Sequence, residues 1–125
     1  MIFKRIDSEH FNSSHKTATA KVSFYGKPFK VQILSKGIVR YNAGLVSKQL
    51  ELKNGKYAIV IKKLIDSCIA NGIQKGLNPE KMYIKTLSVA RGKYLKRIEF
   101  KGRGRRGTVW RAHSNANVEI EEVGE

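Results

Sequence analysis

A chain of 125 residues, 41% of them hydrophobic, can form one folded domain and is not a wholly disordered protein. Its 25 lysines and arginines outnumber its 10 acidic residues and give a net charge of +15, so we expect a polyanion or an anionic surface as its partner. The single cysteine excludes a disulfide framework and a cysteine-based zinc site, and no apolar run is long enough to span a bilayer.

Residues Met1–Ala20 are predicted to form a polar N-terminal tail. The tail has no large apolar residue after Phe11, so we expect it to be extended and to become ordered only on a partner. It lacks the apolar segment of a secretory signal, and Asp7 and Glu9 are unusual in a mitochondrial transit peptide. We therefore expect an organellar gene, or a presequence that was removed or lacks the usual pattern. Residues 21–125 are expected to form a single α+β domain.

Two short half-buried strands are predicted next, because apolar residues alternate with polar ones. The first carries Val22 and Phe24 and ends at the turn Gly26–Pro28. The alternating residues of the second are Phe29, Val31 and Ile33. Ser35 is then expected to cap a short helix, Lys36–Val46.

The clearest predicted element is a helix over Gly55–Lys75, with Asn54 as its N-cap and Gly76 ending it. Its apolar residues recur at helical spacing and form one stripe: Ala58, Ile61, Leu64, Ile65, Cys68 and Ile69. We expect this helix to lie against an antiparallel sheet as the core helix, with Cys68 acting as a small buried hydrophobic residue.

A proline-containing loop leads to a predicted strand, Met82–Val89. The stretch Arg91–Arg111 then contains one acid, Glu99, among nine basic residues: Arg91, Lys93, Lys96, Arg97, Lys101, Arg103, Arg105, Arg106 and Arg111. A last strand is predicted over Thr108–Val123. Two of its apolar residues are expected to point into the core: Val118 and Ile120.

The stretch Gly102–Gly107 reads GRGRRG and fits the dinucleotide-binding pattern G-x-G-x-x-G. That motif needs a strand before it, a helix that opens on its last glycine and an acid about 20 residues further on. Glu121 lies near the required distance, but the residues after Gly107 show no apolar stripe of helical spacing. Without a helix N-terminus there are no free N–H groups to bind pyrophosphate, so we expect no cofactor site.

A long β-hairpin accounts better for the same residues, because strand-like sequence both enters and leaves the glycines. A two-stranded ribbon with few apolar residues is marginal in water, so we expect a bound nucleic acid to stabilise this one. Arginines donate paired hydrogen bonds to phosphate. Three aromatic residues interleave with the charges and can stack on unpaired bases: Tyr94, Phe100 and Trp110. The alternative is a solvated basic loop whose aromatic residues close the hairpin.

Two stretches, AIVIKKLIDSCIANGIQKGLNPEKMYI and RGKYLKRIEFKGRGRRG, resemble the large-ribosomal-subunit protein 22 family. The resemblance runs from about Asn54 to Val123. It keeps the family's order of a core helix ending in SxIAN, a Gly-Leu-x-Pro loop, a strand, LKRI, a basic tip and a return strand. The pattern RGxxLKRIxxxGRGRxG, Arg91 to Gly107, is closer to the mitochondrial branch than to the bacterial one.

The resemblance implies a structural protein on large-subunit rRNA, near the outer end of the polypeptide exit tunnel. It also implies a hairpin over residues 85–118 that helps to line the tunnel, with Arg91–Lys101 and Thr108–Asn115 as its arms. Its tip would consist of Gly102, Arg103, Gly104, Arg105, Arg106 and Gly107. The expected partners are rRNA, neighbouring ribosomal proteins and the nascent polypeptide, without a cofactor or metal. The expected location is the mitochondrial ribosome, with another organelle or a bacterium as alternatives.

The sequence departs from the family pattern in three places. The short second helix is expected to be reduced or absent, because the segment before Asn54 is short. Asn115 stands where the family usually has a histidine, and His113 lies two residues earlier. The tail Met1–Ala20 has no counterpart.

Three other classes of function are weaker. An enzyme is not expected, because the histidines are scattered over His10, His15 and His113 and none forms a recognisable catalytic motif. A free-standing RNA- or DNA-binding chaperone shares the positive charge and remains the alternative. A membrane-surface protein would need a basic amphipathic helix, whereas the predicted core helix places Asp66 among its lysines.

Overall fold

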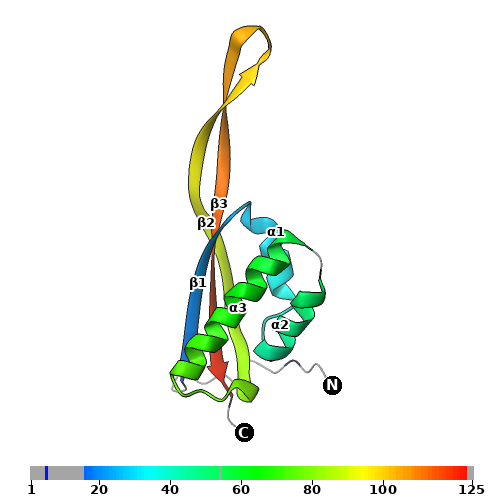
Figure 1. Cartoon of the computed structure of the whole chain (residues 1–125), viewed down its shortest axis with the longest axis vertical. Helices are drawn as coiled ribbons and strands as arrows, with labels where there is room; N and C mark the ends of the chain where they lie inside the picture. The colour runs from blue at the N-terminus through cyan, green and yellow to red at the C-terminus, as the bar shows by residue number, and fades with distance from the viewer. Residues whose placement is uncertain (1–4, 6–15, 54, 124–125) are drawn as a thin grey trace.

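The computed structural model describes residues 5, 16–53 and 55–123. Within these residues, three α-helices cover one face of a three-stranded antiparallel sheet, and two of the strands continue past the helices as a long ribbon (Figure 1). The elements in chain order are β1 (Thr17–Tyr25), α1 (Pro28–Lys36), α2 (Ala43–Leu52), α3 (Lys56–Gln74), β2 (Met82–Lys101) and β3 (Arg105–Glu122). The predicted α+β fold with a core helix and a protruding hairpin is therefore confirmed.

Strand β3 lies at the centre of the sheet and pairs with β1 on one side and β2 on the other. Ile120 is opposite Ala18 on β1 and opposite Ile84 on β2. Because side chains alternate along a strand, every second residue of β3 faces the helices. The buried residues of this row are Ser114, Ala116, Val118 and Ile120. The prediction that Val118 and Ile120 point into the core is confirmed.

Helix α3 contributes the apolar stripe that packs on the sheet. Its buried residues are Ala58, Ile61, Leu64, Ile65, Cys68 and Gly72, while Ile69 is partly buried. The helix ends as predicted around Gly76. The N–H of Gly76 donates to the carbonyl of Ile73, and the N–H of Leu77 donates to that of Gly72, each at 3.0 Å. This pair of bonds satisfies the last carbonyls of the helix. The predicted cap, Asn54, lies outside the described residues.

The predicted second strand is wrong, because Phe29, Val31 and Ile33 belong to helix α1. Two of these three residues, Phe29 and Ile33, are 67% and 57% exposed, and the residues that α1 buries are Val31 and Ser35, one helical turn apart. Pro28 occupies the first turn, where its missing N–H is not needed. Short apolar runs of this kind fit a strand and a helix equally well from periodicity alone.

The predicted helix Lys36–Val46 is wrong in position. The chain turns after α1, with Arg40 at a φ of +71°, and α2 begins only at Ala43. The side chain of Asn42 caps α2 by accepting hydrogen bonds from the N–H groups of Gly44 and Leu45, at 3.0 and 3.4 Å. Since α1 and α2 both precede α3, the expected loss of a short helix is also wrong.

The boundary of the predicted tail needs correction, because β1 begins at Thr17 and Ala18 is fully buried. Thr17–Ala20 therefore belong to the sheet. Most of the remaining tail, residues 1–4 and 6–15, lies outside the described residues. The strand predicted over Met82–Val89 is correct at its start but continues without a break to Lys101.

Candidate nucleic-acid interface

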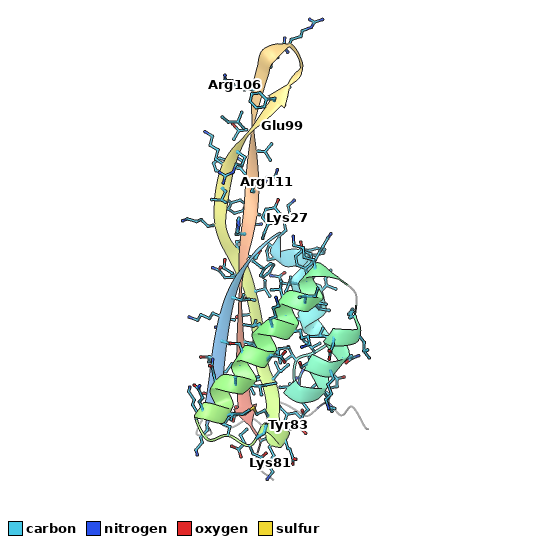
Figure 2. The ribbon with its side chains drawn as sticks, viewed as in Figure 1. Lys27, Lys81, Tyr83, Glu99, Arg106 and Arg111 are labelled. Carbon is cyan, nitrogen blue, oxygen red and sulfur yellow. The ribbon has the colours of Figure 1, made fainter. Side chains whose placement is uncertain are left out.

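The nine predicted cations lie along the ribbon that β2 and β3 form beyond the helices. Five are on β2, one is in the turn and three are on β3, and all nine are exposed. Figure 2 places Glu99, Arg106 and Arg111 along this ribbon, with Glu99 and Arg106 well away from the helices. We call the ribbon, residues 91–114, the hairpin. All nine predicted basic residues therefore lie on this one narrow ribbon.

The hairpin cations have no carboxylate partner among the residues that the structure describes. Among the described residues, the ion pairs join Lys62 to Asp66 and Lys85 to Glu119 and Glu121, and none involves the hairpin. The hairpin's one acid, Glu99, is opposite a glycine in the strand register. Exposed charge of one sign on a narrow element produces a strong local field, which attracts phosphate.

The hairpin turn is shorter than predicted. It consists of Gly102–Gly104, with Arg103 and Gly104 in the left-handed region at φ values of +62° and +70°. Arg105, Arg106 and Gly107 already belong to β3 and pair with Lys101, Phe100 and Glu99. No helix opens on Gly107, so the GRGRRG sequence turns a hairpin and does not form a dinucleotide site.

The base of the hairpin is tied to the body by the turn between β1 and α1. The N–H of Gly26 donates to the carbonyl of Ala112 at 3.0 Å, and the buried hydroxyl of Ser114 donates to the carbonyl of Gly26 at 2.7 Å. The guanidinium of Arg111 donates to the phenolic oxygen of Tyr25 at 2.8 Å, and this bond raises the pKa of Arg111. These contacts fix the direction in which the ribbon leaves the sheet.

Close packing at this base leaves little room for a side chain at Gly26 or at Gly92. Gly26 has a φ of +137°, and a Cβ there would lie 2.5 Å from the hydroxyl oxygen of Tyr57. Gly92 lies in an irregularity of the register between Arg91 and Tyr94, and a Cβ there would lie 3.0 Å from the carbonyl oxygen of His113. A bulge of this kind bends and twists a strand, so it helps to direct the ribbon away from the body.

Sequence reasoning missed a cluster of aromatic and basic side chains at the same place. The ammonium of Lys56 lies 4.7 Å from the ring centre of Tyr25 and 5.4 Å from that of Tyr57. The ring of His113 lies edge-on to that of Tyr25, with 5.4 Å between their centres. Lys56 and Tyr25 are 31 positions apart, and no local pattern links them; only the packing of α3 beside β1 brings them together.

The other reactive side chains do not assemble a site. His10 and His15 lie outside the described residues. Burial raises the pKa of the Cys68 thiol to about 11, and its Sγ donates to the carbonyl of Ala18 at 3.3 Å. Within the described part of the chain, no group of three or more histidine, cysteine or acidic residues could hold a metal ion. In that same part, no helix is long and apolar enough to cross a membrane.

Residues 17–121 match the family model described as Ribosomal protein L22p/L17e. The chain belongs to this family. It is similar to the large ribosomal subunit protein uL22 of Nitratiruptor sp., with 36% identity over 93 residues, which cover 74% of this chain and 83% of that protein. The protein of the same name from Wolinella succinogenes is 33% identical over 95 residues, covering 76% of this chain and 84% of the relative. That from Bdellovibrio bacteriovorus is 37% identical over 76 residues, covering 60% and 69%.

Membership of this family confirms the resemblance to the large-ribosomal-subunit protein 22 family that the sequence analysis stated. It also supports the prediction that the chain is a structural protein and not an enzyme. The matched range begins at residue 17, where β1 begins, so the match includes the first four residues of β1, Thr17–Ala20, which the sequence prediction assigned to the tail.

Proposed function

We propose that this protein is a structural constituent of the large ribosomal subunit that binds rRNA through its hairpin. We further propose that the tip of the hairpin helps to line the polypeptide exit tunnel. The observation that carries the proposal is the row of nine exposed cations on a protruding ribbon, in a chain of this family, with no carboxylate partner in the described part of the chain. The proposed partners are large-subunit rRNA, neighbouring ribosomal proteins and the nascent polypeptide.

The hairpin lacks the packing that would stabilise it on its own. Beyond the helices, none of the described elements forms a second layer over the hairpin to bury its side chains, and its cations repel one another (Figure 1). Phosphate groups on both sides of the ribbon would neutralise this charge and bring rRNA segments together. Binding of the hairpin would then be coupled to folding of the surrounding RNA.

A sucrose gradient of large subunits after a high-salt wash tests the ribosomal placement. The proposal predicts one copy of this protein in each large subunit, measured by mass spectrometry against other large-subunit proteins. The alternative, a free-standing RNA-binding or chaperone protein, predicts release into the light fractions at moderate salt. Release would overturn the proposed structural role.

Crosslinking tests the tunnel placement. A photoreactive amino acid at Arg103, in the exposed turn, should crosslink to nascent chains on translating ribosomes, whereas one at Lys63 on the exposed side of α3 should not. Equal crosslinking from the two positions, or none from Arg103, would contradict a tunnel-facing tip.

We propose a mitochondrial ribosome as the location, with another organelle or a bacterium as the alternatives. The support is the pattern RGxxLKRIxxxGRGRxG over Arg91–Gly107 and its resemblance to the mitochondrial branch. The relatives named above come from bacteria, so a direct measurement is needed. Fractionation of source cells, followed by detection of the protein in purified mitochondria, tests this point, and recovery from the cytosol alone would contradict it.

A further inference from the structure

The strand register sorts the hairpin side chains onto two faces. From the pair Tyr94–Ala112 to the pair Lys101–Arg105 the register has no irregularity, and residues directly opposite each other in an antiparallel pair point to the same side. One side, which we call the aromatic face, comprises Tyr94, Lys96, Ile98, Phe100, Arg106, Thr108, Trp110 and Ala112. The opposite face comprises Leu95, Arg97, Glu99, Lys101, Arg105, Gly107, Val109 and Arg111. Tyr94, Phe100 and Trp110 therefore share one face.

The aromatic face is the outward continuation of the face that the helices cover. The row of β3 residues that begins at Ile120 in the core passes through Ser114 and reaches Trp110 on the hairpin. The ribbon twists beyond the helices, so this face winds along it while neighbours on the face remain neighbours (Figure 1). Its large apolar side chains are exposed: Tyr94 by 45%, Ile98 by 62%, Phe100 by 79% and Trp110 by 60%. A contiguous exposed apolar surface of this kind marks a binding surface.

The charges on the aromatic face indicate which partner it fits. Lys96 lies directly across from Trp110, and Arg106 lies directly across from Phe100. The face holds no acid, because Glu99 is on the opposite side. Opposite residues have Cβ atoms about 4.5–5.5 Å apart, so each of these cations branches from the ribbon next to an aromatic side chain. A nucleotide offers both a flat base for the ring and a phosphate for the cation, whereas an apolar protein surface would leave Lys96 and Arg106 buried without carboxylates.

We propose that the aromatic face binds unpaired nucleotides, with bases stacked on Trp110 and Phe100 and their phosphates bound by Lys96 and Arg106. The opposite face, which has aliphatic side chains in place of rings, contacts the phosphates of paired RNA. This inference rests on the proposed RNA-binding function and specifies the RNA on each side. It gives the hairpin a selectivity for unpaired over duplex segments on one face.

Trp110 is the one tryptophan of the chain, so its fluorescence reports on the aromatic face alone. A labelled single-stranded RNA oligonucleotide and the same strand annealed to its complement are titrated into the full-length protein. Anisotropy of the label measures binding, and tryptophan emission at saturation measures stacking. We expect both RNAs to bind, and we expect only the single strand to quench Trp110.

Substitutions distinguish stacking from general apolar contact. Trp110→Leu keeps apolar bulk but removes the aromatic ring, so single-strand binding should weaken by about 5- to 150-fold, as expected for loss of one stacked base. Trp110→Phe should restore much of that affinity, and Leu52→Ala, at an exposed apolar position on α2 outside both faces, should change it by less than about twofold. Both positions lie outside the buried core. Equal melting temperatures then show that the variants are folded.

The outcomes separate this inference from the function on which it rests. If neither RNA binds, the proposed RNA-binding function fails, and the inference fails with it. If both RNAs bind but the single strand leaves Trp110 unquenched, or the duplex quenches it equally, the selectivity is overturned while RNA binding stands. The emission of Trp110 could also be unchanged by RNA but shift to the blue in the assembled large subunit. That result would assign the aromatic face to a protein partner and would also overturn the inference.

Discussion

Removing the arginines at the hairpin tip should weaken the salt dependence of RNA binding. The change is the triple substitution Arg103→Gln, Arg105→Gln and Arg106→Gln, which preserves polar side chains and removes three charges. Because all nine hairpin cations are exposed and none forms an ion pair within the described residues, each can neutralise a phosphate. The tip variant should therefore release fewer counterions on binding.

The magnitude follows from the number of contacts. Each neutralised phosphate changes the slope of log K against log salt by about −0.9 on duplex and about −0.7 on single strands. Nine contacts predict a slope of about −6 to −8 for the unmodified protein, and the tip variant should be shallower by about 2 to 3. Anisotropy of a labelled rRNA fragment over a series of potassium chloride concentrations measures both slopes.

A matched variant tests whether the position of the removed charges matters, and not only their number. Lys30→Gln, Lys36→Gln and Lys48→Gln remove three exposed charges from helices α1 and α2, and hence the same net charge. This variant should keep a slope close to that of the unmodified protein. If the two triple variants give equal slopes, the hairpin is not the main RNA contact and the electrostatic reasoning is refuted.

Three further predictions concern stability and reactivity. Gly26→Ala should lower the free energy of unfolding by about 2–4 kcal/mol, because the new side chain strains the backbone and clashes with Tyr57. Gly102 has open space around it, so Gly102→Ala should change the free energy of unfolding by less than about 0.5 kcal/mol. Urea denaturation measures both. Burial alone would raise the pKa of the Asp66 carboxyl. Hydrogen bonds from Lys62 and Ser47 have the larger combined effect and lower this pKa below its ordinary value of 3.8. The resulting stabilisation is present above pH 3.8 and is lost as the pH falls through the lower folded-state pKa, so acid unfolding curves of Asp66→Asn should lack this component. Cys68 should react with iodoacetamide at pH 8 only at the rate of unfolding, because it is fully buried; rapid labelling of native protein would contradict its packing.

The parts of the fold that were predicted correctly have long, regular signals. Helix α3 has a stripe of six apolar residues at helical spacing, and the hairpin has glycines between two long strand-like segments. The failures came where the signal was short. Phe29, Val31 and Ile33 alternate like a strand, yet the chain forms a helix because Val31 and Ser35 pack inward one turn apart. Thr17–Ala20 have only small side chains, and the sequence therefore predicts a tail there. In the structure, small residues fill the narrow space between β1 and α3, where Ala18 is buried.

The candidate interface was predicted in composition but not in geometry. Charge counting identified the nine cations, since charge needs no knowledge of contacts. The two faces of the hairpin could not be predicted, because they depend on the pairing of Tyr94 with Ala112. A shift of one residue would place Trp110 on the face opposite to that of Tyr94 and Phe100. The cluster of Tyr25, Lys56 and His113 was missed for the same reason, as it forms only when β1, α3 and β3 pack together.

Ultraviolet crosslinking of intact large subunits tests directly whether the hairpin is the main contact with rRNA. The protein is digested at acidic residues, since trypsin would cut the hairpin after each of its nine cations, and peptides that carry nucleotides are identified by mass spectrometry. We expect most adducts to fall within residues 91–111, with Trp110 and Phe100 among the modified side chains. Adducts confined to helices α1–α3, with none on the hairpin, would contradict this expectation.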